Sequence, residues 1–302
     1  MTDRRRSWFA RLAAYMIVAA AGPGALLGCE EGVDPFIESE RYFSLFGTLD
    51  MNADTQWVRI VPIDRDILVE PGDTIDARVS MTDLVTSAQT VWTDSVFTFA
   101  DGSRGHVFFA PVRVQPDHTY RLEVSRSDGS TSTAETTVPP LPAASVGEVE
   151  RVIFSNGAVE ITIPITWNGV ERPPTEVQTW YRFGTTARSN FEDLRIDYPT
   201  ADGSTDAGWQ IVARLSSDRQ TIVEQIIPEN FLFLGMGMRI VVLDDQFVPP
   251  GGVFDPDVLS QPGALSNVDN GFGFVGSIGR FEVQWVVDGQ TAADLGYTVP
   301  KR

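Results

Sequence analysis

Alternation of apolar and polar residues is the dominant pattern after residue 41, and it predicts β-strands. The clearest examples lie within 74–81, 119–127 and 158–167, where every second residue is apolar. Such a pattern buries one face of a strand and leaves the other face in water. Further segments rich in aromatic and β-branched residues stand at 42–49, 56–63, 106–112, 130–138, 176–186, 194–198, 209–215, 239–244 and 280–287. The chain is therefore predicted to be all-β.

Only the segment 217–227 has the apolar spacing of a short helix, with Ser217 as its cap. About seven short strands fit within residues 42–138, a density typical of a β-sandwich. Tyr120 follows a turn in the manner of the tyrosine corner of immunoglobulin-like and fibronectin-like sandwiches, where the Tyr hydroxyl bonds to upstream backbone. Asp128-Gly129 predicts a hairpin turn directly after this strand.

Three prolines at positions 139, 140 and 142 predict a stiff break in the chain. We therefore expect an immunoglobulin-like β-sandwich over 42–138 and a Pro-rich linker over 139–145. A second antiparallel β-rich domain with at most one short helix is expected over 146–302.

The N-terminus has the features of a secretory signal peptide. Four Arg residues precede an uncharged run over 12–27, which is shorter than the ~20 residues that span a bilayer. The run ends in Leu26-Leu27-Gly28-Cys29, which resembles the bacterial lipobox. In lipoproteins with this motif the Cys becomes the first residue of the mature protein and carries the lipid. We expect residues 1–28 to be a lipoprotein signal peptide, Cys29 the lipidation site and 29–41 a tether.

The lipid would hold the protein on a membrane, and the outer membrane is the expected location. Glu30, Glu31 and Asp34 follow the Cys. Acidic residues in this position resemble the export signal of surface-displayed lipoproteins, and they also fit a solvated tether. The periplasmic and the surface-exposed face both stay open.

Composition narrows the chemistry further. The 302 residues carry a net charge of −18, which argues against nucleic-acid binding because a phosphate backbone needs a basic partner surface. One Cys excludes an internal disulfide framework, a Cys-rich zinc site and an iron–sulfur cluster, and two His leave little for a His-based metal centre. No cofactor and no metal are predicted.

Two short motifs resemble ligand sites but lack the required context. Residues 271–276 spell G-x-G-x-x-G, yet an alternating strand follows where a dinucleotide fold needs a helix. Residues 50–54 open like an EF-hand loop, but Thr55 and Val61 stand where that loop needs Gly and Glu. A packed strand and a polar turn are the expected roles. The acidic pairs Asp64/Asp66 and Asp255/Asp257 leave calcium binding and solvated loop charge as alternatives.

Catalytic motifs are missing from the sequence. It contains neither G-x-S-x-G nor H-E-x-x-H, and no motif ties His106 or His118 to a serine. His118 is expected to be a solvated loop residue, and the protein is predicted not to be an enzyme. Trp167 and Trp285 share strand faces with aliphatic residues and are expected in a core, whereas Trp57 and Trp92 are candidates for a surface platform that stacks on a ligand.

The segment Ser266-Asn267-Val268-Asp269-Asn270-Gly271-Phe272-Gly273-Phe274-Val275-Gly276 resembles the closing motif of a bacterial lipoprotein family that is known only as a domain of unknown function. The family pattern is roughly S-N-[IV]-x-x-G-[LFI]-G-x-F-[GA], and Val275 stands where it has Phe. The resemblance implies a lipobox, an N-terminal immunoglobulin-like region and a cell-envelope protein, often encoded near TonB-dependent transporters. It implies no catalytic residue. Physically, we expect a packed turn in which Asn267 bonds to backbone and Gly271, Gly273 and Gly276 admit close strand contact.

Three functional hypotheses follow from these observations. The first is a non-enzymatic binding or scaffolding accessory of the envelope, with a protein partner such as an outer-membrane transporter. The second is a carbohydrate-binding or adhesive surface module that uses exposed aromatic residues. The third is a polysaccharide-acting enzyme with two converging carboxylates. The ligand and the oligomeric state stay unassigned.

Overall fold

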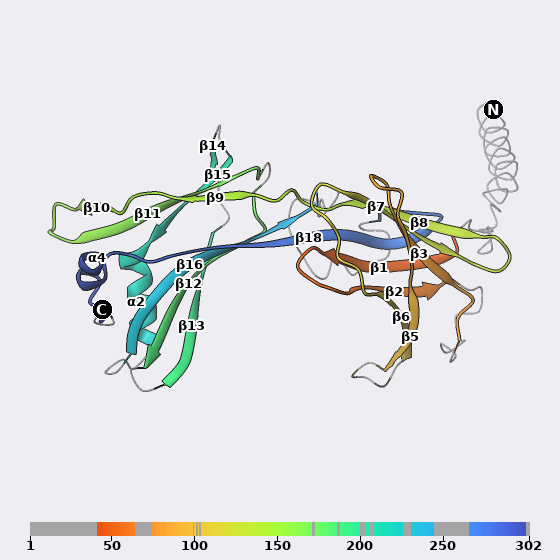
Figure 1. Cartoon of the computed structure of the whole chain (residues 1–302), viewed down its shortest axis with the longest axis horizontal. Coiled ribbons are helices and arrows are strands. Elements are labelled where there is room, and N and C mark those ends of the chain that lie inside the picture. Colours follow the sequence, from red (N-terminus) through yellow and green to blue (C-terminus); the bar gives the residue numbers. More distant parts are fainter. Residues whose placement is uncertain are drawn as a thin grey trace, which may run out of the picture. The chain divides into compact units, whose positions relative to one another are not determined.

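β-Strands make up most of the described chain, and they pair into three sheets (Figure 1). The computed structural model describes residues 41–63, 74–98, 100, 102, 104–170, 173–185, 188–199, 203–205, 208–225, 231–244 and 266–299. The all-β, sandwich-like fold predicted from the alternating pattern is confirmed.

Sheet A combines strands from both ends of the sequence. Its eight strands are, in spatial order, β13 (Arg188–Tyr198), β12 (Glu176–Thr185), β16 (Phe231–Leu243), β18 (Gly271–Trp285), β1 (Phe43–Asp50), β2 (Gln56–Pro62), β6 (Arg104–Ala110) and β5 (Thr93–Thr98). β1 and β18 pair in parallel, and the other neighbours in this sheet pair antiparallel.

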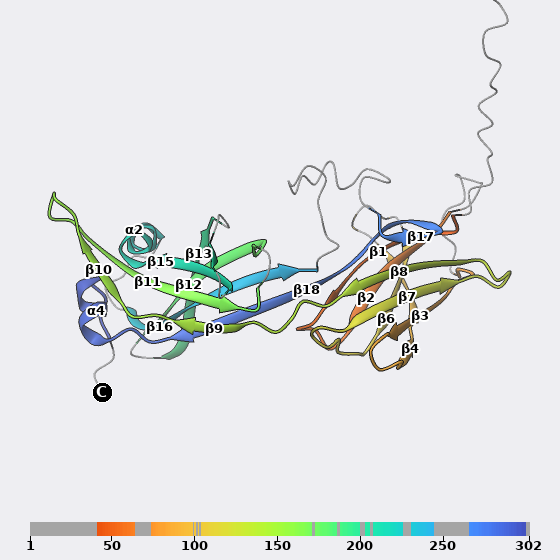
Figure 2. The ribbon, with the colours of Figure 1, turned by 90° about the horizontal axis from the view of Figure 1, so that it is seen from above.

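The two smaller sheets are antiparallel (Figure 2). Sheet B contains β17 (Val268–Asp269), β8 (Thr131–Thr137), β7 (Thr119–Ser125), β3 (Arg78–Asp83) and β4 (Gln89–Val91). Sheet C contains β10 (Glu150–Ile153), β11 (Val159–Asn168), β15 (Gly208–Arg214) and β14 (Ser204–Thr205), and β9 (Ala143–Val146) also pairs with β11.

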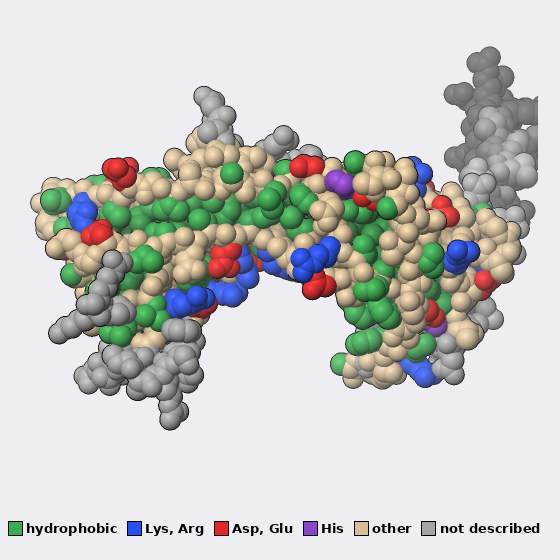
Figure 3. All heavy atoms as spheres, viewed as in Figure 1, with side chains coloured by type: hydrophobic (Ala, Val, Ile, Leu, Met, Phe, Trp, Pro, Cys, Tyr) green, Lys and Arg blue, Asp and Glu red, His purple; other side chains and the backbone are tan. Residues whose placement is uncertain are grey.

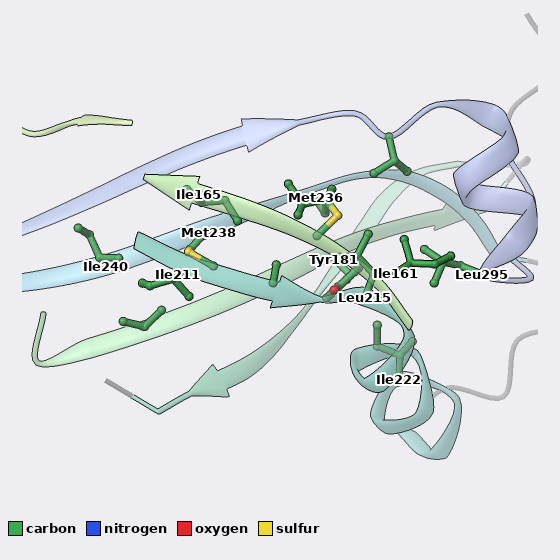
Figure 4. Packing of buried hydrophobic residues seen from close by; sticks show 14 of the residues in the cluster. Ile161, Ile165, Tyr181, Ile211, Leu215, Ile222, Met236, Met238, Ile240 and Leu295 are labelled. Carbon is green, nitrogen blue, oxygen red and sulfur yellow. The ribbon is translucent and has the colours of Figure 1, made fainter. Parts of the chain in front are cut away.

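Two clusters of buried side chains lie between these sheets. The first cluster joins strands of sheets A and B and includes Leu45 and Leu122. The second cluster joins strands of sheets A and C with the helices and includes Ile165, Met238 and Leu215 (Figure 4). Burial of these alternating apolar faces is the main stabilising contribution to both.

β18 contributes to both clusters. Val275 belongs to the first cluster and Phe281 to the second. These residues are six positions apart, so they point to the same side of the strand and place sheets B and C on one face of sheet A. The opposite face, which we call the outer face, has neither sheet B nor sheet C against it. The segment 266–278 lies within the predicted domain 146–302, yet it packs with strands of 42–138.

Two helices occur in the described chain, and one of them was not predicted. The helix α2 (Leu215–Gln225) begins before Ser217, so Ser217 is not its cap and instead donates a hydrogen bond to Glu160 at 3.3 Å. The missed helix is α4 (Gly289–Asp294), which Asp288 caps by accepting the Thr291 N–H. Within the described ranges, neither helix is long and apolar enough to cross a membrane.

Pro164 lies inside β11. β10 pairs with β11 up to Thr162, and β9 pairs with it from Ile165 onward. Pro164 therefore falls between two partners, and its carbonyl accepts the Gly147 N–H at 2.8 Å on that same side. The pairing with β15 tolerates the proline because its missing donor faces away from that strand.

Candidate binding surface

Aromatic side chains gather on the outer face of sheet A, where β18, β1, β2, β6 and β5 run side by side. Register partners point to the same side of a sheet, and Phe46 pairs with Phe274 while Trp57 pairs with Phe109. Their chain neighbours are buried in the first cluster, so these rings point away from it. We call this surface the aromatic face; its rings are Phe46, Trp57, Phe97, Phe109, Phe272 and Phe274.

Three of these rings are strongly exposed. Phe46 and Trp57 are each 49% exposed and Phe97 is 54% exposed, and hydrophobic side chains are visible at the surface around β2, β5 and β6 in Figure 3. The other three rings are partly buried between their neighbours. Single exposed apolar residues are common, but contiguous ones are characteristic of interaction sites.

The rings are held by contacts with each other and with an Arg side chain. Trp57 stacks on Phe109 with ring centroids 5.0 Å apart and an interplanar angle of 30°. The Arg41 guanidinium lies 4.2 Å from the centroid of the Phe272 ring, within the range of a cation–π contact. These contacts restrict the rings before any ligand arrives.

Glycines of the closing motif, 266–276, make room for these rings. A Cβ on Gly276 would lie 2.5 Å from Cε1 of Phe274, so the Phe274 ring lies over this glycine. A Cβ on Gly273 would lie 2.1 Å from the Leu45 carbonyl oxygen and 3.1 Å from Cε1 of Phe46. Gly273 also has a φ of +96°, which favours glycine.

Asn267 fastens the start of β18 through its side-chain amide. Its Nδ2 donates to the carbonyls of Glu135 at 3.0 Å and Val275 at 2.7 Å, and its Oδ1 accepts the Val275 N–H at 2.9 Å. The Ser266 hydroxyl accepts the Val268 N–H at 3.4 Å. These bonds make a packed turn that orders the β18 end of the aromatic face.

Between the rings the aromatic face carries small polar residues and little charge. The hydroxyl residues at the described outer positions are Ser44, Thr48, Thr93 and Ser95. The charged residues at the described outer positions of β1, β2, β6 and β5 are Asp50 and Arg59, and Asp50 forms an ion pair with Arg280. With Arg280 and with Arg41 over Phe272, the described charges of the face are three Arg and one Asp, so it lacks the acidic excess of the chain as a whole.

The two tryptophans proposed as a platform do not lie together. Trp57 is on the aromatic face, whereas Trp92 is only 5% exposed and belongs to the first cluster. The assignment of Trp92 to a surface platform is therefore wrong, because this residue packs between the sheets. Trp167 lies in the second cluster, as expected, and Trp285 packs against it.

Both histidines bind carboxylates. Nδ1 of His106 lies 2.9 Å from Asp94, and Nδ1 of His118 lies 2.8 Å from Asp83, so His118 is not simply a solvated loop residue. Burial alone would raise the pKa of the Asp83 carboxyl, but hydrogen bonds from His118 and the following turn lower this pKa to about 2. Tyr120 accepts the Gln115 N–H at 2.8 Å, which is the bond expected of a tyrosine corner.

A buried carboxylate connects α2 to sheet A. Asp218 is 5% exposed and accepts hydrogen bonds from the hydroxyls of Tyr181 at 2.5 Å, Tyr198 at 2.6 Å and Thr179 at 3.2 Å. Burial raises the pKa of the Asp218 carboxyl despite these donors, and the nearby Glu160 adds to the rise. Burial also raises the pKa of Tyr181 and Tyr198.

A cavity of about 180 Å³ lies where the two clusters meet, and its lining includes Asp117 and Asp244. Asp244 is 3% exposed, and its carboxylate accepts hydrogen bonds from the Thr136 hydroxyl and from the Ser277 N–H. These bonds hold the carboxylate in place within the protein. Across the described residues, no group of three or more His, Cys, Asp or Glu side chains is placed to hold a metal ion.

Comparisons with known proteins give no family. No protein family and no curated protein matches the sequence. Among solved structures, the chain is similar to a cytokine receptor complex, with 9% identity and a TM-score of 0.21, covering 65% of this chain and 83% of that one. It is also similar to the pullulanase of Anoxybacillus sp. LM18-11, with 11% identity and a TM-score of 0.23, covering 68% of this chain and 26% of that one. These similarities are too weak to assign a function.

Several predicted residues fall outside the described ranges. They are the lipobox Leu26, Leu27 and Gly28, the lipidation site Cys29, and the acidic pairs Asp64/Asp66 and Asp255/Asp257.

The phenylalanines of the aromatic face were not predicted from the sequence. The available signal was in 42–49, where Phe43 and Phe46 stand at positions of opposite parity and predict apolar side chains on both faces of the strand.

Proposed function

We propose that this protein is a lipid-anchored, non-enzymatic binding protein of the outer membrane that acts as an accessory of an envelope complex. Such a complex could be built around an outer-membrane transporter of the TonB-dependent kind. The observation that carries the proposal is the aromatic face, with its three strongly exposed rings, Phe46, Trp57 and Phe97, on strands β1, β2 and β5 of one sheet. Exposure of this much aromatic surface is costly in water unless a ligand covers it.

Several features of this surface support binding rather than catalysis. The rings stand on paired strands, so a ligand meets a rigid surface and little ordering cost is added on association. The acidic side chain at its border, Asp50, is paired with Arg280. The two histidines bind Asp94 and Asp83.

The predicted lipid at Cys29 would keep this surface close to a membrane. Cys29 lies 14 positions before Phe43, where β1 begins. Even a fully extended segment of this length spans at most about 50 Å. An anchored protein would therefore meet membrane partners at a high effective concentration, which favours weak but specific contacts.

The anchor is tested by membrane fractionation of cells that produce the chain with Cys29→Ser. We expect the unmodified protein in the outer-membrane fraction and the variant in the soluble fraction. The partner is tested in the same cells with a photo-reactive amino acid at position 57, with position 286 as the control, because Val286 is 67% exposed but outside the aromatic face. Membrane retention of Cys29→Ser, together with equal crosslinking from both positions, would refute the proposed function.

A further inference from the structure

We propose that the aromatic face binds the sugar rings of a neutral polysaccharide. This inference rests on the proposed function, because it names the chemical class of ligand for the same surface. Three features of the structure support it: flat rings that face solvent, hydroxyl groups between the rings, and the pairing of the carboxylate on this face with an Arg side chain.

The rings are arranged for stacking. Trp57 lies against Phe109 and is still 49% exposed, so part of the indole is open to a ligand. The Phe274 ring lies over Gly276, which keeps it low on the sheet. Neighbouring strands are about 4.8 Å apart, so rings on β18, β1, β2 and β6 follow one another at short intervals. The apolar C–H face of a pyranose ring fits such a row, and a chain of sugars contacts several rings at once.

The residues between the rings fit a sugar as the ligand of this surface. At the described outer positions of these strands the aliphatic residues are Val61, Val107 and Ile278, and none is Leu or Met. Protein interfaces with an interlocking core use such longer side chains, and methionine in particular is enriched there. The aromatic face instead supplies hydroxyls, among them Ser44, Thr48 and Ser95, which can donate to and accept from sugar hydroxyls.

The charge of the chain favours a neutral ligand. The protein carries a net charge of −18, so an anionic polymer would be repelled at long range. On the face itself Asp50 is already paired with Arg280, so a neutral chain can cover the rings without stripping water from an unpaired carboxylate there. A neutral polysaccharide meets both conditions.

The test is affinity electrophoresis of the purified full chain in detergent, through gels containing β-glucan, xylan, mannan or starch. A gel containing alginate provides an anionic polysaccharide. We expect at least one neutral polysaccharide to retard the protein. Trp57→Ala and Phe46→Ala should each weaken that binding at least about tenfold, as expected for central aromatic anchors, and Trp57→Phe should weaken it less.

Val286→Ala is the matched control, because it removes an exposed apolar side chain elsewhere, and its binding should equal that of the unmodified chain. Circular dichroism checks that each variant is folded. We expect the alanine variants to fold, because Phe46 and Trp57 are half exposed and outside the buried clusters. Retardation by none of the neutral polysaccharides, retardation by alginate alone, or unchanged binding in both alanine variants would overturn the proposal. Crosslinking from position 57 to an outer-membrane protein, without polysaccharide binding, would overturn this inference and leave the proposed function standing.

Discussion

At the scale of single residues, the structure assigns a packing role to the glycines of the closing motif, 266–276. G-F-G-F-V-G resembles a nucleotide-binding loop, but its glycines admit a neighbouring strand and an aromatic ring. Gly273 shows this most clearly, because its φ is +96° and a Cβ there would meet the backbone of β1. The motif therefore shapes the aromatic face rather than a phosphate site.

Gly273→Ala is expected to destabilise the protein by more than about 2 kcal/mol, since it adds backbone strain and a clash with the Leu45 carbonyl. Chemical denaturation followed by circular dichroism measures the change. Gly289→Ala is the control, because a Cβ at that position has open space and we expect a change of less than about 1 kcal/mol. Equal stability of the two variants would contradict the assigned role of Gly273.

The residue scale also marks a limit of sequence reasoning. Trp57 and Trp92 both stand beside polar residues, yet one is exposed and the other is buried. Trp92 lies between the short strands β4 and β5, where too few residues alternate to reveal a buried side. Trp92 is buried because sheet B packs against it, and the position of sheet B cannot be predicted from the sequence near Trp92.

At the scale of elements, period-two alternation predicted most long strands because burial of one face leaves a strong signal in the sequence. It failed where that signal is weak. β10 is exposed on both faces, and α4 has only six residues, too few for a helical period. The parallel pairing of β1 with β18 was also missed, because alternation reports which residues are buried and not which strand lies beside them.

Asp218 attaches α2 to sheet A, and its raised pKa predicts how the stability of the protein changes with pH. The pKa of its carboxyl is raised in the folded protein, so its stabilising contribution is complete below about pH 3.8 and is lost as pH rises through the raised value. The unfolding free energy of the unmodified chain should therefore be higher than that of Asp218→Asn, and the difference should be largest near pH 4. This difference should become smaller toward pH 8.

Urea denaturation at several pH values measures this difference. Asp288→Asn is the contrasting control, because hydrogen bonds from Thr291 lower the folded pKa of Asp288, so its contribution is lost only as pH falls below about 3.8. Between pH 5 and pH 8 the difference in unfolding free energy caused by Asp288→Asn should stay constant. An excess for Asp218 that grows with pH would show that its charged form is the stabilising one.

At the scale of the whole molecule, β18 joins the two clusters that the sequence assigned to separate domains. The prolines at 139–142 do mark a change of sheet, since β8 belongs to sheet B and β9 to sheet C. The last long strand, β18, packs against both clusters, and sheet A therefore continues from one cluster to the other. This continuity gives the aromatic face a rigid base that neither cluster would supply alone.

Hydroxyl-radical footprinting shows whether a ligand covers the aromatic face in the envelope. Oxidation is compared between intact outer membranes and the purified protein. We expect Phe46, Trp57 and Phe97 to be protected in the membranes, whereas Phe154, which is 51% exposed on the hairpin after β10, should be oxidised equally in both samples. Equal oxidation of the aromatic face in both samples would show that no ligand covers it.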